Sequence, residues 1–324
     1  MKAMLNRRYG PAEDLKLEEI DPPALEPGHV LVRVKAAAVN AGDWRLMRGW
    51  PRVARPMMGG LRGPDPPVRG WDLAGVVEAV ADDVETLKSG DEVFGTGGGT
   101  FAELATTRAH TLAVKPPWLS FDDAGAIGVA AVTALQALRD RVQVKPGQRV
   151  LITGAGGGCG TFAVQIAKAY GAEVTAVCSA GKVALVQELG ADRVIDYALE
   201  DFTRDRRRYD AIFDIAGGRS IRATRRALAA DGTMVVVGGK GNIVGPIARV
   251  AQVFLLAKLA RRQKLLPFLA HPTTDDLLEL VAMIEAGKLR VVVDRTYPLA
   301  ETGAAIRYVE DGHVRGKAVV RVAD

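Results

Sequence analysis

Hydrophobic residues in the middle of the chain follow two alternating periods. Short apolar runs of strand length are separated by segments with the spacing of amphipathic helices. The predicted strands are residues 150–153, 173–178, 193–196, 210–215 and 233–237, and predicted helices begin at Thr161, Lys182 and Ser220. Such alternation is typical of a parallel, doubly wound sheet. We therefore predict an α/β Rossmann domain over residues 123–269, whose first helix, 124–138, is capped by Asp122.

The first 120 residues have a different pattern. Residues 30–36 and 76–80 alternate like half-exposed strands, and residues 88–95 predict a turn that leads into a strand. Many short strands joined by proline-rich turns favour a compact β-barrel. Near the end of the chain, residues 275–286 predict a helix, and residues 291–294 and 317–322 return to strand character. We expect the C-terminal segment to rejoin the barrel, which would then comprise residues 1–122 and 270–324.

A glycine-rich turn separates the first predicted Rossmann strand from its helix. It contains Gly156, Gly157, Gly158 and Gly160, with Cys159 among them. Glycines let the backbone approach a pyrophosphate, and the N-terminus of the following helix offers free N–H groups. The strand–turn–helix context therefore predicts a dinucleotide site. A tight structural turn without a ligand is the alternative.

The end of the second Rossmann strand indicates which dinucleotide binds. An NAD site carries an acidic residue about 20 residues beyond the glycine loop, where it contacts the ribose. Here the strand leads into Ser179 and then Lys182. A hydroxyl and an ammonium group suit a 2′-phosphate, so we expect NADPH rather than NADH. In the alternative interpretation, Lys182 is an exposed residue in the first turn of a helix.

Composition and charge restrict the class of protein, its ligands and its cellular setting. The 324 residues are 48% hydrophobic and 25% charged, which is ordinary for a soluble globular protein. The net charge of +5 is compatible with small anionic ligands, and no nucleic-acid-binding motif is present, so nucleic acid is not expected. Two cysteines, no secretory signal at the N-terminus and no apolar run of transmembrane length favour a reduced, cytoplasmic setting. The basic run 204–208 is interpreted as a solvated helix end or loop.

The ordered motifs together resemble the medium-chain dehydrogenase/reductase superfamily, in particular its quinone oxidoreductase branch. The resemblance covers nearly the whole chain and rests on residues 40–43, 70–77, 90–95, 129–134, 154–160, 189–197, 235–239 and 313–317. It implies a GroES-like catalytic barrel, discontinuous in sequence, beside a Rossmann domain. It also implies a cofactor in the cleft between the two domains and a homodimer.

Residue roles follow from this resemblance by position. Gly156, Gly157, Gly158, Cys159 and Gly160 would hold the pyrophosphate. Ser179, Lys182 and Tyr197 resemble a 2′-phosphate cluster, while Thr133, Gly238 and Gly239 would face the nicotinamide. His313 and Arg315 would close near the cofactor from the barrel. In the simpler alternatives, Tyr197 is a packed aromatic residue at a strand end and His313 is an exposed loop residue.

The positions that resemble the zinc ligands of this superfamily carry Asn40, Trp71 and Val129. A catalytic zinc needs three protein ligands, and neither Trp nor Val can be one. The stretch after Val84, where a structural zinc lobe would stand, contains no cysteine, so we expect no zinc. Without a Lewis acid the oxidation of simple alcohols is disfavoured. Hydride transfer to quinones or α,β-unsaturated carbonyls needs chiefly proximity and orientation.

Candidate residues for a small electrophilic substrate lie in the barrel half. Asn40 resembles the family's asparagine in the substrate cleft, which implies that it donates a hydrogen bond to the acceptor oxygen, and Asp43 is predicted to anchor its loop. Trp44, Trp50 and Trp71 either form an apolar wall for a flat ring or pack the lobe. Two other functions stay open: an enoyl or alkenal double-bond reductase, and a nucleotide-binding protein without turnover that has a structural or nucleic-acid-binding role.

Two local features add hypotheses. Cys159 stands where the family commonly has a small apolar residue, and a cysteine at a helix N-terminus is often reactive. An apolar filler is the favoured interpretation, and the other hypothesis is a modestly reactive thiol that NADPH shields. Residues 246–268 mix leucines with Arg and Lys after the last predicted Rossmann strand. They are interpreted as a lid or dimer-facing segment, with contact to a membrane surface as the less favoured alternative.

Overall fold

The computed structural model describes residues 1–324 except 50–51, 53–54, 57–59, 239–243, 260–261 and 323–324. The described chain forms two compact units. The first comprises residues 1–132, 272–281 and 291–324, and the second comprises residues 133–271 and 282–290. The predicted boundaries, at residues 122/123 and 269/270, differ from these limits. Ala126 packs with Ala36 in the core of the first unit, and Arg290 exchanges two backbone hydrogen bonds with the Gln165 side chain in the second.

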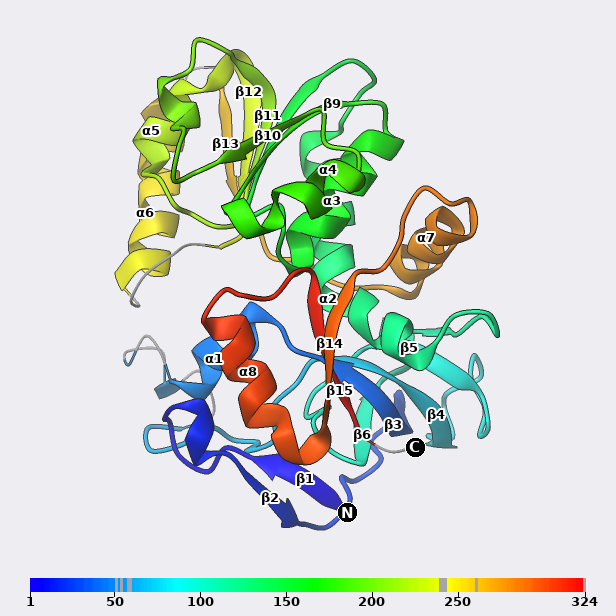
Figure 1. Ribbon diagram of the computed structural model, residues 1–324. Helices are drawn as coiled ribbons and strands as arrows, with labels where there is room; N and C mark the ends of the chain where they lie inside the picture. The colour runs from blue at the N-terminus through cyan, green and yellow to red at the C-terminus, as the bar shows by residue number, and fades with distance from the viewer. Residues whose placement is uncertain (50–51, 53–54, 57–59, 239–243, 260–261, 323–324) are drawn as a thin grey trace. The chain divides into compact units, whose positions relative to one another are not determined.

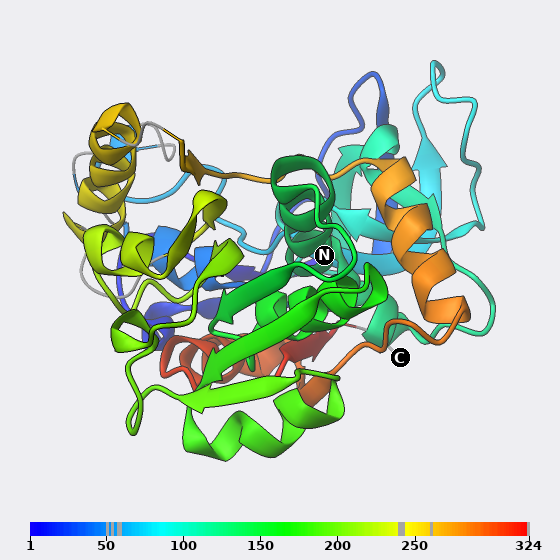
Figure 2. The same ribbon diagram turned by 90° about the horizontal axis from the view of Figure 1, so that it is seen from above.

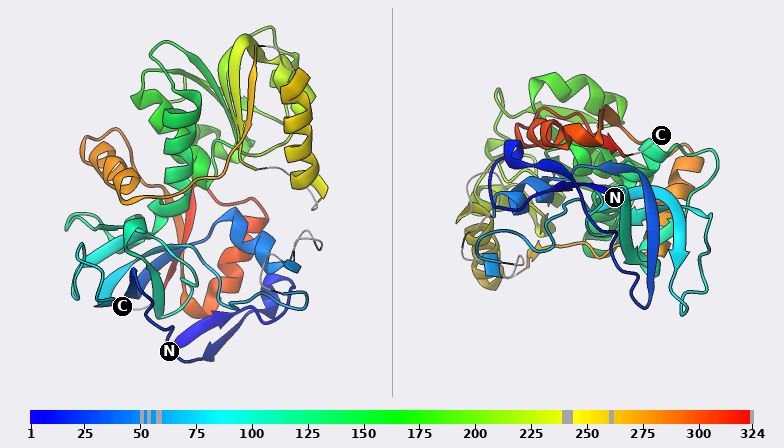
Figure 3. Two further views of the ribbon diagram at one scale, coloured as in Figure 1. Left: turned by 180° about the vertical axis from the view of Figure 1, so that it is seen from behind. Right: turned by 90° about the horizontal axis from the view of Figure 1, so that it is seen from below.

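The first unit is built on a seven-stranded sheet in the order β14-β15-β3-β4-β5-β7, in which β6 also pairs with β3. Its strands are β3 (His29–Ala38), β4 (Asp72–Val80), β5 (Glu92–Thr96), β6 (Leu104–Arg108), β7 (Leu112–Val114), β14 (Val293–Pro298) and β15 (Lys317–Arg321). A separate antiparallel pair, β1 (Lys2–Leu5) and β2 (Lys16–Glu19), lies at one end of this unit (Figure 3). Alternate residues of β3, such as Val30, Val32 and Val34, are fully buried and build the core.

Helices of the first unit are short or shared. They are α1 (Ala41–Met47), most of α2 (Phe121–Gln136), the start of α7 (Thr274–Glu285) and α8 (Thr302–Glu310). The predicted cap of α2 is wrong: Ser120 Oγ accepts from the backbone N–H of Asp123 at 3.1 Å, while Asp122 accepts from Arg321 Nε at 3.0 Å. The carboxylate that was predicted to cap α2 is therefore bonded to an arginine 199 residues away in the sequence.

The second unit is a doubly wound parallel sheet, as predicted, in the order β10-β9-β8-β11-β12-β13 (Figure 1). The strands are β8 (Arg149–Thr153), β9 (Glu173–Cys178), β10 (Arg193–Asp196), β11 (Tyr209–Asp214), β12 (Leu228–Val236) and β13 (Lys264–Pro267). The helices α3 (Gly158–Ala169) and α4 (Val183–Glu188) cover one face of the sheet, and α5 (Ile221–Arg226) and α6 (Val244–Leu259) cover the other (Figures 1 and 2). Chain order reverses at β8, which is where ligands bind in such sheets.

Residues 264–267 were not expected in the sheet. They pair in parallel with β12, so β12 is not the last Rossmann strand and α6 is a crossover helix to β13. Val253 of α6 is fully buried in the core of the unit, whereas Phe254 and Leu255 are exposed. The sequence Lys264–Pro267 has only two leucines between a lysine and a proline, and so short a run does not show a strand period.

By length and composition alone, the helical residues 121–142 could cross a membrane. This differs from the prediction that no apolar run reaches transmembrane length. This helical stretch is 72% buried inside the protein over its most apolar window, as in the core helix of a folded domain.

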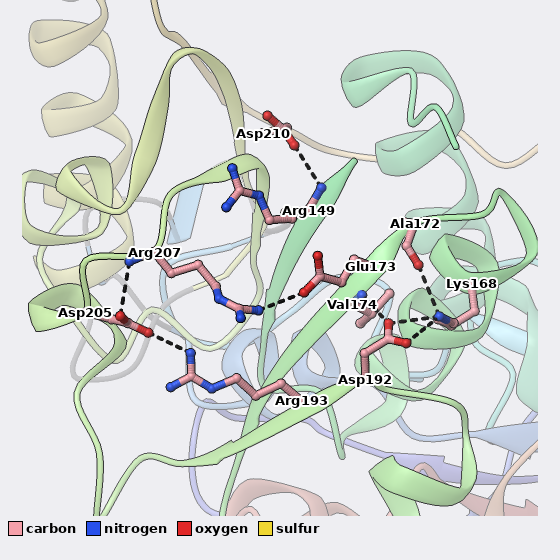
Figure 4. A network of polar contacts seen from close by, with 10 residues as sticks. All are labelled: Arg149, Lys168, Ala172, Glu173, Val174, Asp192, Arg193, Asp205, Arg207 and Asp210. Carbon is pink, nitrogen blue, oxygen red and sulfur yellow. Dashed lines mark hydrogen bonds and ion pairs between the residues drawn. The ribbon is translucent and has the colours of Figure 1, made fainter. Parts of the chain in front are cut away.

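A polar network joins the strand beginnings of the second unit (Figure 4). Arg207 Nη1 lies 2.8 Å from Glu173 Oε1, and Arg193 Nη1 lies 2.6 Å from Asp205 Oδ2. Lys168 Nζ donates to Asp192 at 2.8 Å. These contacts fix the edge of the sheet where strands begin. The opposite edge, where the strands end, carries the glycine-rich turn.

Candidate dinucleotide and acceptor sites

The turn after β8 has the geometry of an anion site. Gly154 has φ +70°, a conformation that favours glycine, and a Cβ on Gly160 would lie 2.2 Å from the carbonyl oxygen of Gly154. These two glycines therefore fix the tight passage from strand to helix. Gly157 is the N-cap of α3 and provides no side-chain cap, so the N-terminus of this 12-residue helix stays available to a ligand.

Gly157 distinguishes a ligand site from a purely structural turn. Its φ of −98° suits any residue, and a Cβ there would meet only the Gly154 carbonyl oxygen, at an ordinary 3.5 Å. The protein's own packing does not need glycine at this position. Close approach of a bound pyrophosphate does need it, so the described residues fit a dinucleotide.

The residues expected around a 2′-phosphate gather at the ends of β9 and β10. The backbone N–H of Lys182 donates to the Ser179 carbonyl oxygen at 2.9 Å. The backbone N–H of Tyr197 donates to the Cys178 carbonyl oxygen at 3.1 Å, and the Tyr197 side chain is 45% exposed. The aliphatic carbons of Lys182 pack against Gly156. Lys182 thus lies beside the glycine loop, and Ser179 and Tyr197 follow the neighbouring strands β9 and β10.

A buried clamp, which sequence reasoning missed, shapes the neighbouring loop. Asp214 Oδ1 accepts from Thr153 Oγ1 at 2.7 Å and from the Gly217 backbone N–H at 3.1 Å. Its other oxygen pairs with the Arg249 guanidinium, which also donates to the Arg219 carbonyl oxygen at 2.8 Å. Nothing in the sequence marks Arg249 as a buried partner, because an arginine on a helix is most often exposed.

The clamp holds residues 215–219 beside the glycine turn. Thr153 Oγ1 accepts from the Ile215 backbone N–H at 3.1 Å, and a Cβ on Gly238 would lie 2.4 Å from the Ile215 carbonyl oxygen. Gly238 is therefore needed for close packing on this loop, while Gly239 lies outside the described residues. Thr133, at the start of the second unit, is buried in α2.

The two cysteines of this unit differ in environment. Cys159 is partly exposed in the first turn of α3, whereas Cys178 is buried at the end of β9. Burial, with the charge of Asp196 as a second cause, raises the pKa of the Cys178 thiol to about 11. Cys178 is therefore a packed, unreactive thiol.

In the first unit, Asn40 belongs to a buried ionic network. Lys317 Nζ lies 2.9 Å from Asp72 Oδ2 and donates to Asn40 Oδ1 at 2.7 Å; the Lys317 and Asp72 side chains are 1% and 0% exposed. Asn40 Nδ2 donates to Asp72 Oδ2 at 2.9 Å, and the Val129 backbone N–H donates to Asp72 Oδ1 at 2.6 Å. The Asn40 amide thus links β3, β4 and β15, and its oxygen already has a charged partner.

Asp43 lies beneath this network with the contacts of a loop anchor. Its Oδ2 accepts from the Asn40 backbone N–H at 2.7 Å, which completes a capping box at the start of α1. Burial is the main cause that raises the pKa of Asp43 to about 7, and the charge of Asp72 adds to it.

A cavity of about 340 Å³ opens beside Asp72 in the first unit. Trp71 and Val129, two of the three positions that resemble zinc ligands, line it. The other lining residues are polar residues, glycines and one proline, namely His29, Thr96, Gly97, Gly98, Thr106, Thr107, Arg108, Thr111 and Pro272. In the described ranges, no three His, Cys, Asp or Glu residues are grouped as a metal would require. Trp44 packs on the barrel core, and Trp50 lies outside the described residues.

The segment with His313 and Arg315 is held by one carboxylate. Asp294 Oδ2 accepts from the Tyr308 hydroxyl at 2.7 Å and from the Arg315 backbone N–H at 2.9 Å. The His313 ring stacks at a tilt on Tyr308, with their centroids 6.3 Å apart. Both the His313 and the Arg315 side chains are exposed, so they are free to contact a ligand.

Comparisons with known proteins agree with both halves of this architecture. Residues 26–117 match the family described as "Alcohol dehydrogenase GroES-like domain", and residues 189–320 match "Zinc-binding dehydrogenase". A chloroplast envelope quinone oxidoreductase homolog of Arabidopsis thaliana is 30% identical over 334 residues, or 99% of this chain and 98% of that one. The solved quinone oxidoreductase from Coxiella burnetii is 31% identical, with a TM-score of 0.88 over 100% and 99% of the two chains.

The chain belongs to the medium-chain dehydrogenase/reductase superfamily, in its quinone oxidoreductase branch. Another relative is similar over 99% of this chain and 79% of its own: the NADPH-dependent alkenal/one oxidoreductase, chloroplastic, of Arabidopsis thaliana, at 32% identity. The Lys317–Asp72 pair joins the segments that carry Asn40, Trp71 and Val129, the positions that resemble zinc ligands. The predicted fold, with a GroES-like domain and a Rossmann sheet, is confirmed.

Proposed function

We propose that the protein is an NADPH-dependent reductase of quinones and α,β-unsaturated carbonyls. The observation that carries the proposal is the glycine turn with an uncapped helix, in which Gly157 has no packing reason to be glycine and Lys182 lies alongside. The names of the relatives, a quinone oxidoreductase homolog and an alkenal/one oxidoreductase, support the same class of reaction.

The second unit would hold the cofactor. The N-terminus of α3 and the glycine turn would bind the pyrophosphate, since both present backbone N–H groups to an anion. Ser179, Lys182 and Tyr197 would bind the 2′-phosphate, and the hydroxyl and ammonium groups there favour NADPH over NADH. When bound, the nicotinamide supplies hydride, and the clamp of Thr153, Asp214 and Arg249 keeps the neighbouring loop in one conformation.

The first unit would hold the acceptor. The Trp71 indole offers a flat apolar surface in the 340 Å³ cavity, and Val129 extends it. Quinones and conjugated enones are planar, so they suit this wall better than a saturated alcohol does. Asn40 would act by positioning this wall through Asp72, because its amide nitrogen already donates to Asp72 Oδ2 and to the Ala38 carbonyl oxygen. The proton that completes reduction would come from solvent.

Loss of NADPH absorbance in the presence of three acceptors tests the function. We expect turnover with a benzoquinone and an enal, and little with a simple saturated aldehyde. Equal rates with the aldehyde would contradict the acceptor class. No oxidation with any acceptor, despite tight NADPH binding, would instead favour a nucleotide-binding protein without turnover.

We also propose that no zinc takes part. The support is chemical: Trp71 and Val129 cannot ligate a metal, and Lys317 places an ammonium group beside Asp72 and Asn40. Metal analysis of the active protein, together with its rate before and after treatment with a chelator, decides this point; stoichiometric zinc that is lost together with activity would refute it. The homodimer and the cytoplasmic location stay predictions from the sequence.

A further inference from the structure

A groove lined by arginines lies in the second unit, away from the glycine turn. It has a volume of about 320 Å³ and is lined by Arg222, Arg225, Arg226, Leu228 and Gln263. Leu228 is the first residue of β12, and the arginines lie on α5 directly before that strand. The groove is therefore at the edge where strands begin, opposite to the edge that carries the dinucleotide turn.

One of the three arginines is held in a fixed orientation. Arg225 Nε donates to Gln263 Oε1 at 2.6 Å. The amide nitrogen of Gln263 donates in turn to the carbonyl oxygens of Ala229 and Leu228, at 3.0 and 3.3 Å. Gln263 is thus anchored on β12 and fixes the guanidinium plane of Arg225 through its inner nitrogen. The two terminal nitrogens of Arg225 are left for a ligand, in the fork geometry that matches a phosphate or carboxylate.

The charges of the groove are not neutralised within the part of the chain that the structure describes. Arg193 and Arg207, on the same edge of the sheet, are each paired with a carboxylate (Figure 4). No described carboxylate lies within 4.0 Å of a side-chain nitrogen of Arg222, Arg225 or Arg226. Arg222 and Arg226 are one helical turn apart on α5, so their side chains lie on the same face and repel each other. An anion between them would remove this repulsion.

We propose that this groove is a second anion site, which binds the phosphate group of a phosphate ester. Three guanidinium groups, one of them pre-oriented, suit a dianion better than a monoanion, because each can donate to a different oxygen. The volume is about ten times that of one water molecule in the liquid, so the groove has room for the phosphate and part of its substituent.

The phosphate can come from a soluble ester or from a phospholipid headgroup. The neighbouring helix α6 packs beside α5 and exposes Phe254 and Leu255, which are 57% and 63% accessible. A headgroup source would use these apolar side chains for contact with the bilayer, whereas a soluble ester would not need them. The two sources therefore differ in their dependence on Phe254 and Leu255.

Calorimetric titration with glycerol 3-phosphate, at low ionic strength, measures the site directly. We expect binding that Arg222→Gln and Gln263→Leu each weaken by roughly three- to thirtyfold, since each removes one charge-assisted contact or its orientation. Arg62→Gln removes an exposed arginine of the first unit and serves as the matched charge control. Lys182→Ala removes phosphate binding at the dinucleotide turn and should leave the groove unchanged.

The lipid source is measured by co-sedimentation with vesicles of phosphatidylglycerol and, separately, of phosphatidylcholine. Binding to the anionic vesicles alone, lost in Arg222→Gln and in the double variant Phe254→Ser/Leu255→Ser, supports the site with a headgroup ligand. Binding of the soluble ester without vesicle binding supports the site with a free phosphate ester. The proposal is overturned if neither probe binds, or if Arg222→Gln and Gln263→Leu bind both probes as well as Arg62→Gln does.

Discussion

The side chain of Lys182 lies directly against Gly156. A Cβ on Gly156 would approach both Cβ and Cδ of Lys182 to 2.7 Å. The lysine stem is therefore already ordered beside the glycine loop, and less rotamer entropy is lost when its ammonium group meets a phosphate. The same contact explains why position 156 is glycine: a larger residue would displace the lysine.

Replacing this lysine should change the choice between the two dinucleotides. We expect Lys182→Ala to lower the ratio of kcat/KM for NADPH to that for NADH by about tenfold or more, since a charge-assisted contact to the 2′-phosphate is lost. Steady-state kinetics with each cofactor measures the ratio. Lys145→Ala, an exposed lysine before β8 at the opposite edge of the sheet, should leave it unchanged. An unaltered ratio in Lys182→Ala would remove this residue from the site.

Two glycines of the turn should respond differently to the same substitution. Gly157→Ala adds a methyl group that meets only ordinary contact, so we expect the free energy of unfolding to change by less than about 1 kcal/mol and the KM for NADPH to rise. Gly160→Ala places its methyl group within 2.2 Å of a backbone oxygen and should destabilise the unit strongly. Denaturant unfolding and cofactor titration together separate the two effects. A Gly157→Ala protein that binds NADPH normally would contradict close approach of the pyrophosphate.

Asp43 should make stability depend on pH. Its pKa of about 7 exceeds the value near 3.9 expected in an unfolded chain, so between these values the folded state keeps a proton that the unfolded state has lost. The contribution of Asp43 to the free energy of unfolding is therefore largest below about pH 4. It declines as the pH rises towards 7, by roughly 4 kcal/mol in total. Asp43→Asn keeps an acceptor for the Asn40 backbone N–H and should flatten the decline.

Denaturant unfolding of wild type and Asp43→Asn across this pH range gives the comparison. Asp82→Asn removes an exposed carboxylate and should follow the wild-type curve. Parallel curves for wild type and Asp43→Asn would show that the proton of Asp43 is not coupled to folding.

Removal of only one partner of the Lys317–Asp72 ion pair should destabilise the protein. Lys317→Met leaves the fully buried Asp72 carboxylate without its cation, so we expect destabilisation by about 3–5 kcal/mol. The double variant Asp72→Asn/Lys317→Met removes both charges and should recover part of this loss. Lys88→Met, at an exposed position, is the matched control for the substitution itself. Equal stability of Lys317→Met and Lys88→Met would refute the proposed ionic link between β4 and β15.

The two thiols should differ in reactivity. We expect maleimide to label Cys159 and to leave Cys178 unmodified at neutral pH, because Cys178 is buried and its pKa is raised to about 11. NADPH should slow the labelling of Cys159, which lies in the turn that would bind the pyrophosphate. Mass spectrometry of wild type and Cys159→Ser, with and without NADPH, identifies the modified residue. No labelling of native protein in the absence of NADPH would support the role of Cys159 as an apolar filler.

The sequence alone determined the parts that depend on local periodicity and on the backbone needs of glycine. Apolar runs that alternate with helical spacing predicted the Rossmann sheet, and glycines at 156–160 between a strand and a helix predicted the dinucleotide turn. Ser179 and Lys182 could be assigned to the cofactor site because both follow the second strand, at the place where an NAD site would carry an acidic residue. These inferences use neighbours in sequence or one rule of topology.

Only the tertiary structure decided which charged side chains become buried partners. Asn40, Asp72 and Lys317 are separated by up to 277 residues, and Arg249 of helix α6 pairs with Asp214 at the end of strand β11. The sequence does not distinguish a solvated Lys or Arg from a buried and paired one, because burial depends on a carboxylate that the fold brings close. The same limit hid the strand at residues 264–267 and the three arginines that face one groove.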